Sequence, residues 1–192
     1  MKNLNETERF HLKSILAKAF INNKSVNYIL KREHDMSLIL RLMDYSINKA
    51  KKYGWVWVND QNSACCIILD PLKAKKMTLY SIFLDIKLVF TVVGVNNVGK
   101  VFKKENLTNK YLPKNINFVH LWFIGVESTV QGQGLGSEFL KQIISYYIDK
   151  TDAICLETST LINIPFYEKL GFEIYHVEDF GFDFYFLIKY LK

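Results

Sequence analysis

The order of hydrophobic patterns predicts an α+β protein, with mixed α/β secondary structure around one mixed sheet. Two segments near the start repeat apolar residues at helical spacing, and a pair of strand-like runs follows them. Beyond residue 117, strand-like and helical patterns alternate before a closing pair of strands. Such an order is typical of helices packed on one sheet. Neither a repeat nor a linker interrupts the chain, so we expect a single domain over residues 1–192.

The N-terminal part is expected to supply two helices and a hairpin. Residues 6–20 and 35–53 each place their apolar side chains on one helical face, and Asp35 can cap the second helix. Residues 55–58 and 63–69 are strand-like runs separated by a polar turn. They are expected to pair as an antiparallel hairpin.

The middle of the chain is expected to form a helical insertion at about residues 72–116. Residues 77–93 fit a helix, and the lysine-rich residues 95–112 are expected to be helical and then to run into a loop. Charged residues interrupt the apolar run of residues 77–93, which is therefore predicted not to span a membrane.

The C-terminal part is expected to alternate strands and helices. The predicted order is a strand at 118–126, a helix from the following glycines to about 150, a strand at 153–157, a short helix at 164–170, and a hairpin made by 172–177 and 182–191. Asn163 can cap the short helix, and Gly171 can end it.

Composition excludes several classes of function. The net charge of +6 comes mostly from lysine, which indicates a solvated surface or a basic entrance for an anionic cofactor. No basic helix or RNA-binding aromatic motif is visible, so we expect no nucleic-acid partner. The cysteines Cys65, Cys66 and Cys155 lack metal-ligand spacing. We expect them to be reduced in the cytoplasm, and we expect no metal, no signal peptide and no membrane attachment.

Three alternating glycines, Gly132, Gly134 and Gly136, stand between the apolar run 118–126 and an amphipathic helix. Glycines let the backbone curl so that several N–H groups approach one ligand. The start of a helix adds about half a positive charge. Strand, glycine turn and helix together predict a phosphate-bearing ligand.

One interpretation is a dinucleotide site. Gly132, Gly134 and Ser137 nearly fit G-x-G-x-x-G, and Glu157 lies where a ribose-binding acid would be expected. However, residues 127–131 separate the strand from the first glycine, and too little chain follows Glu157 to complete a doubly wound sheet. A dinucleotide is therefore much less favoured than a second interpretation.

Two motifs resemble the GNAT N-acetyltransferase superfamily. Residues 131–136, Gln-Gly-Gln-Gly-Leu-Gly, fit Q/R-x-x-G-x-G/A, and Asn163, Tyr167 and Gly171-Phe172 fit N-x-x-x-Y-x-x-x-G-F. The resemblance covers about residues 118–174. It implies the GNAT fold, a twisted, mostly antiparallel sheet whose parallel central strands splay apart. It also implies acetyl-CoA as the acetyl donor.

The resemblance also implies where acetyl-CoA binds. The pyrophosphate would lie on the N–H groups of residues 133–137, and the pantetheine would lie along the edge of the central strand like an added strand. The residues expected to bind the cofactor are Ile124, Gly125, Val126, Gln131, Gly132, Gln133, Gly134, Leu135, Gly136, Ser137, Asn163 and Phe166. Asn163 can bond the pantetheine, cap its helix, or do both.

The expected catalytic residues are Tyr167 and His120. A tyrosine hydroxyl can protonate the departing thiolate, although Tyr167 can also be a core residue. His120, on the same predicted strand face as Trp122 and Ile124, can take a proton from the amine or belong to the core. Glu157 can contact the substrate or cap the next loop.

We therefore expect an N-acetyltransferase that transfers the acetyl group from acetyl-CoA directly to a primary amine of a small molecule or protein. A covalent intermediate is not expected, because no cysteine lies in an activating context. The alternative is a catalytically silent acyl-CoA-binding module. The expected partners are acetyl-CoA and the amine acceptor, with the protein as a monomer or homodimer.

Overall fold

The computed structural model describes residues 5–74 and 78–192 and confirms the predicted mixed α/β fold. A six-stranded sheet has the order β1-β2-β3-β4-β6-β5. The strands are β1 (Gly54–Val58), β2 (Ala64–Leu69), β3 (Phe118–Val126), β4 (Ala153–Thr158), β5 (Glu173–Asp179) and β6 (Asp183–Tyr190). The helices are α1 (Glu6–Phe20), α2 (Lys24–Asn27), α3 (Met36–Tyr53), α4 (Pro71–Ala74), α5 (Leu79–Leu88), α6 (Val98–Tyr111), α7 (Leu135–Tyr147) and α8 (Ile164–Glu168).

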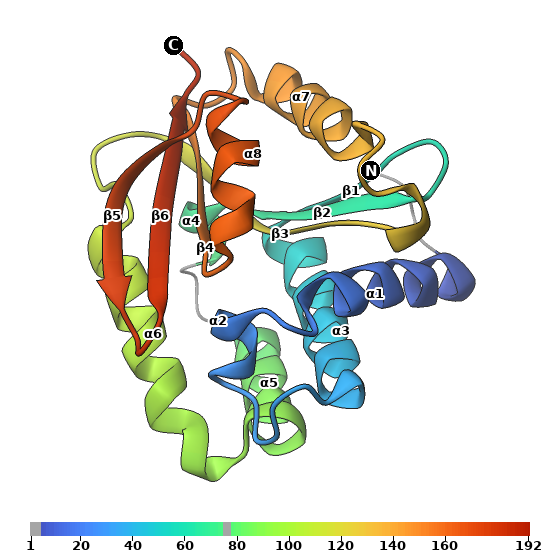
Figure 1. Ribbon diagram of the computed structural model, residues 1–192. Coiled ribbons are helices and arrows are strands. Elements are labelled where there is room, and N and C mark those ends of the chain that lie inside the picture. Colours follow the sequence, from blue (N-terminus) through green and yellow to red (C-terminus); the bar gives the residue numbers. More distant parts are fainter. Residues whose placement is uncertain (1–4, 75–77) are drawn as a thin grey trace.

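Helices cover both faces of the sheet (Figure 1). On one face, α1 and α3 bury Leu16 and Ile39 against Ile67 of β2. On the other, α7 buries Leu140 against Ile154 of β4. Helices α1, α3 and α7 each bury one apolar stripe, as the helical spacing predicts. Burial of a large aliphatic side chain contributes about 1.5–3 kcal/mol.

Most predicted element boundaries agree with the structure, including the start of α3. The Asp35 carboxylate accepts hydrogen bonds from the backbone N–H groups of Ser37 and Leu38 and so caps α3. The helix expected to reach about residue 150 ends at Tyr147, because Ile148 is extended with a ψ of 136° and Asp149 has a positive φ of 64°.

The described residues between β2 and β3 include α4, α5 and α6. The predicted helix at 77–93 starts at a residue outside the described ranges, and its described part comprises α5 followed by a π-helical turn at Val89–Val93. Within the described ranges, no single helix is long and apolar enough to cross a membrane. The bent pair Leu79–Val93 and Val95–Tyr111, at 106°, meets that criterion by length and composition.

The central strands β3 and β4 are parallel, whereas every other pair of neighbouring strands is antiparallel. Their register covers only three pairs, from Phe118 with Ala153 to His120 with Cys155. Both strands continue beyond this point, β3 to Val126 and β4 to Thr158, without pairing to each other. The facing edges of the two strands are therefore free of a strand partner over their C-terminal parts.

A β-bulge changes which side chains share a face of β3. Ile67 and Ile68 of β2 are consecutive but pair with Phe123 and Leu121, so Trp122 is an extra residue in β3. As a result, Trp122 packs with the α1–α3 cluster and Ile124 with the α7 cluster. The expectation that His120 and Ile124 share a face is therefore wrong, because strict alternation takes no account of the bulge.

Gly125 of β3 packs closely against α1, which yields a stability prediction. A Cβ there would lie 3.1 Å from Leu16 Cδ2 and 3.4 Å from Ala19 Cβ. We expect Gly125→Val to lower the free energy of unfolding by about 1–3 kcal/mol through overpacking, measured by urea denaturation. Gly99→Val in α6 is the control, because a Cβ there meets nothing within 4 Å. Equal effects of the two substitutions would contradict the prediction.

Candidate active site

The glycine turn places an exposed loop at the start of α7. A short 3₁₀ turn at Ser128–Val130 follows β3, and Gly132 and Gly134 then adopt positive φ angles of 80° and 82°. Gly134 is the N-cap of α7. Because side chains disfavour this backbone region, glycine is needed for the loop to curl tightly into the helix.

The backbone of this loop offers several hydrogen-bond donors. Among the described residues, the N–H groups of residues 132–137 have no hydrogen-bond partner, and the first bond of α7 runs from Glu138 N–H to the Gly134 carbonyl oxygen. These donors lie at the positive end of α7, where an anion is stabilised. The loop therefore fits a phosphate or pyrophosphate group.

Gly136 allows α7 to lie close to β3 and α8. A Cβ at this position would lie 3.3 Å from Val126 Cγ2 and 3.8 Å from the Phe166 ring. The three predicted cofactor-binding residues are thus close to one another, although they come from α7, β3 and α8.

The free edge of β3 begins at the bulge and leads toward the loop. Glu127 donates its N–H to the Ser63 carbonyl oxygen on the β2 side at 2.8 Å. Since backbone groups alternate along a strand, those of Ile124 and Val126 point to the opposite edge. The Gln131 side-chain amide donates to the Val126 carbonyl oxygen at 2.8 Å and ties the loop to this edge.

Tyr167 of α8 is buried on the same face of the sheet as α7. Its ring contacts the rings of Phe166 and Phe172, and Ile124 and Val126 pack against the same cluster. The Tyr167 side chain is buried, with the residue only 5% exposed. Burial, with the neighbouring Cys66 thiol, raises the pKa of Tyr167 above its ordinary value, so the hydroxyl stays protonated near neutral pH.

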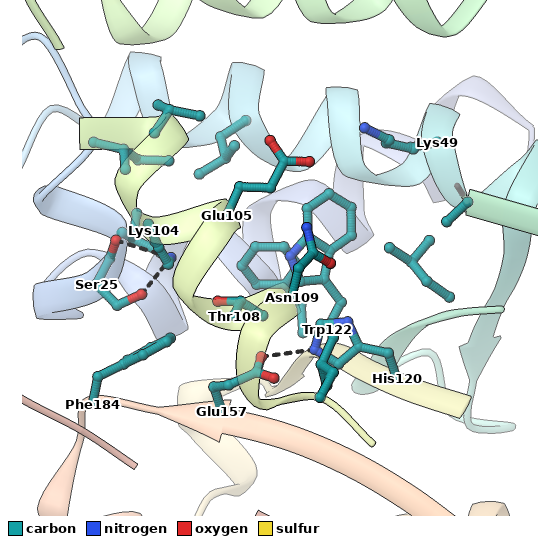
Figure 2. A pocket seen from close by; sticks show the side chains of 18 of the residues that line it. Ser25, Lys49, Lys104, Glu105, Thr108, Asn109, His120, Trp122, Glu157 and Phe184 are labelled. Carbon is teal, nitrogen blue, oxygen red and sulfur yellow. Dashed lines mark hydrogen bonds and ion pairs between the residues drawn. The ribbon is translucent and has the colours of Figure 1, made fainter. Parts of the chain in front are cut away.

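His120 and Glu157 form a pair across β3 and β4, where strand pairing ends (Figure 2). His120 Nε2 lies 2.7 Å from Glu157 Oε2, and the two side chains are only 12% and 8% exposed. The carboxylate accepts the Nε2–H bond and favours the tautomer whose lone pair is on Nδ1. His120 thus has a ring nitrogen that can accept a proton.

A cavity of about 600 Å³ lies beside this pair. Its lining residues come mainly from α3, α5, α6, β3 and β4, and they include His120, Trp122 and Glu157. Tyr167 does not line this cavity and instead packs in the α7 cluster. The two predicted catalytic residues therefore lie on opposite faces of the sheet, next to the region where β3 and β4 do not pair.

Several other polar groups of the cavity have partners within it. Lys104 Nζ donates to Ser25 Oγ at 2.5 Å and to the Ser25 carbonyl oxygen at 3.3 Å (Figure 2). Burial lowers the pKa of Lys104 to about 8, an effect that the negative Glu157 partly opposes. Lys49 Nζ lies 2.7 Å from the Tyr45 hydroxyl and 3.2 Å from Asp85 Oδ1.

Some cavity residues were absent from the predicted catalytic set. Glu157 had a sequence signal, because it is a charged residue at the end of the apolar run 153–157. Lys104 and Ser25 had no such signal, because their approach depends on how α6 packs near α2.

Asn163 differs from one expectation, since its side chain makes no capping hydrogen bond and is exposed. Over residues 5–74 and 78–192, no group of three His, Cys, Asp or Glu side chains could hold a metal ion.

Comparisons with known proteins find similarity to acetyltransferases. Residues 90–174 match the family model described as an acetyltransferase (GNAT) domain. The Ebony C-terminal condensation domain in complex with beta-alanyl-dopamine superposes with a TM-score of 0.66 at 10% identity, covering 97% of this chain and 96% of that chain.

Two further solved structures superpose over nearly the whole chain. A histone acetyltransferase-related protein from Corynebacterium glutamicum has a TM-score of 0.60 at 16% identity, covering 97% of this chain and 92% of that one. Arylalkylamine N-acetyltransferase 2 from Aedes aegypti has a TM-score of 0.59 at 11% identity, covering 100% and 98%. Because the sequence identities of the three structures are only 10–16%, the superpositions show a shared fold. The chain thus has the fold of GNAT acetyltransferases, and its residues 90–174 match that family's domain model.

Proposed function

We propose that this protein is an acetyl-CoA-dependent N-acetyltransferase that acetylates a primary amine by direct transfer. The observation that supports the proposal most strongly is the unpaired region between β3 and β4. It has the donor-rich glycine loop and Tyr167 on one side, and the His120–Glu157 pair and a cavity on the other. Such an arrangement can receive an acyl donor and an acceptor from opposite faces and bring them together in between.

The donor would be held by backbone groups. The N–H groups of residues 132–137 fit the pyrophosphate, while the edge of Ile124 and Val126 fits the amides of the pantetheine. When bound, acetyl-CoA supplies an activated acetyl group as a thioester. Gly125 contributes differently, because its missing side chain makes room for α1 on the far side of β3.

Two side chains would move protons. His120 Nδ1 takes the proton that the acceptor nitrogen loses as the C–N bond forms, directly or through a water molecule, and Glu157 stabilises the resulting imidazolium. Tyr167 gives its proton to the sulfur as the C–S bond breaks. A thiol has a reference pKa of about 8.5, below that of tyrosine, so Tyr167 recovers its proton readily from solvent.

We further propose a single domain that works in the cytoplasm as a monomer or homodimer, with acetyl-CoA and an amine as its partners. The cysteines Cys65, Cys66 and Cys155 are buried and free of disulfides, which supports a reducing compartment. This part of the proposal can be tested by cell fractionation and light scattering.

The glycine loop yields a binding prediction. We expect acetyl-CoA to raise the melting temperature of the protein and to bind in calorimetry. Gly134→Val is expected to weaken that binding at least about tenfold, because the side chain disturbs the backbone that would meet the phosphates. Gly181→Val is the matched control, since Gly181 also has a positive φ, 83°, with nothing near its Cβ position. Failure of the unaltered protein to bind acetyl-CoA would overturn the proposed donor.

Tyr167 yields a kinetic prediction. We expect Tyr167→Phe to lower kcat by about 10²-fold or more while changing the KM for acetyl-CoA little, because only the proton donor is lost. An amine panel with a coenzyme A thiol readout measures the rates. Tyr147→Phe is the control, since Tyr147 is also a buried tyrosine but packs against Trp55 and Trp57. A wild-type rate in Tyr167→Phe would refute this mechanism, and acetyl-CoA binding without turnover on any amine would favour a silent module.

A further inference from the structure

Glu157 has one carboxylate oxygen that the fold leaves without a partner. Oε2 accepts the bond from His120 Nε2, but Oε1 is buried and has no hydrogen-bond partner among the described residues. A buried carboxylate oxygen without a donor costs about 1–3 kcal/mol or more. Among the described carboxylates, Glu157 alone has an oxygen in this condition, and its side chain lines the cavity. The site therefore lacks one hydrogen-bond donor.

Three lysines line the cavity, Lys49, Lys104 and Lys114, and none of them donates a hydrogen bond to Glu157 Oε1. Lys104 is held by Ser25, and Lys49 is held by Tyr45 and Asp85. Figure 2 shows Lys104 beside Ser25, and it shows His120 as the group bonded to Glu157. The donor for Oε1 is therefore expected to arrive with a ligand. The terminal torsion of a glutamate is broad, so a small rotation can present Oε1 to an incoming group.

Much of the remaining cavity wall is apolar. Hydrophobic side chains reach it from α1, α3, α5, α6, β3 and β6, and among them are Phe20, Leu42, Leu88, Phe102, Trp122 and Phe184. Contact between this apolar part of the wall and an apolar ligand is favourable, whereas a second charge placed against it would be desolvated. A volume of about 600 Å³ suits a small molecule.

We propose that the acceptor is a small amphipathic primary amine whose ammonium group binds Glu157 and whose hydrophobic body lies along this apolar wall. This inference rests on the proposed acetyl transfer and names its substrate class. Glu157 Oε1 accepts an N–H bond from the ammonium group, and the pair is strong because both groups are charged and shielded from water. His120, bonded to the same carboxylate, is the neighbouring base that would take a proton from this nitrogen, directly or through a water molecule.

The same features disfavour two other classes of amine. A polyamine would place further charges against the apolar wall, which costs free energy. Two other carboxylates line the cavity, and of these Asp85 already pairs with Lys49, which leaves Glu105 as a second acidic group. A lysine on a folded protein would have to reach Glu157 through a cavity that α6 helps to enclose, with Val98, Val101 and Phe102 among its lining residues. A compact amine with one charge meets neither obstacle.

The test measures binding directly. Phenethylamine and its neutral analogue phenethyl alcohol are titrated calorimetrically into the coenzyme A-saturated protein, with spermidine and a lysine-containing peptide as further ligands. We expect phenethylamine to bind at least tenfold more tightly than each of the other three. Equal binding of the amine and the alcohol, or tighter binding of spermidine or the peptide, would overturn the proposal. This comparison needs no variant.

Glu157→Gln then tests the residue itself. It keeps the shape of the side chain but removes the charge, and we expect it to abolish the preference for the amine over the alcohol. Glu178→Gln is the matched control, because Glu178 also binds a histidine, His176, at 3.1 Å, and does not line the cavity. Circular dichroism verifies that both variants fold. If Glu157→Gln retained the preference, the assigned ammonium site would be wrong.

The outcomes separate this inference from the proposed function. If phenethylamine binds as expected but is not acetylated in the presence of acetyl-CoA, the acceptor site stands and the proposed activity fails. If other amines are acetylated while phenethylamine neither binds nor reacts, the activity stands and the proposed substrate class is wrong.

Discussion

The candidate site depends on the incomplete pairing of two parallel strands. β3 and β4 share three residue pairs and then continue without pairing, although buried backbone groups normally find partners. The cost of such an opening is offset by strong antiparallel pairing on the outer side of each strand, with β2 and with β6. The opening can therefore persist in the folded protein and offer its edges to a ligand that behaves like an added strand.

The bulge at Trp122 separates the functions of the two faces of β3. His120 precedes the bulge and lies on the cavity side of the sheet. Ile124 and Val126 follow the bulge and lie on the side of α7 and Tyr167. The extra residue thus places Ile124 and Val126, the proposed cofactor-binding residues, on the face opposite to the proposed base His120. The two proposed proton-transfer groups, Tyr167 and His120, can then act on opposite sides of the same acyl group.

Local patterns predicted much of this site, whereas contacts across the fold could not be predicted. The glycine turn and the Asn163–Tyr167 motif are short, and their geometry follows from backbone freedom and helix termini. The sequence pattern singles out Glu157 but does not indicate its partner, because 37 residues separate it from His120. The cavity wall made by α6 was also missed, since a lysine-rich helix gives no indication of which face packs on the sheet.

The sequence by itself determined the order of elements, the helix faces, the glycine loop and the type of ligand that the loop favours. These follow from periodicity and local backbone preferences, which act over a few residues. Only the tertiary structure decided that β3 carries a bulge, that β3 and β4 stop pairing after His120 and Cys155, and that Glu157 Oε1 remains unpartnered. Each of these depends on register and packing between segments far apart in the chain, which no local pattern encodes.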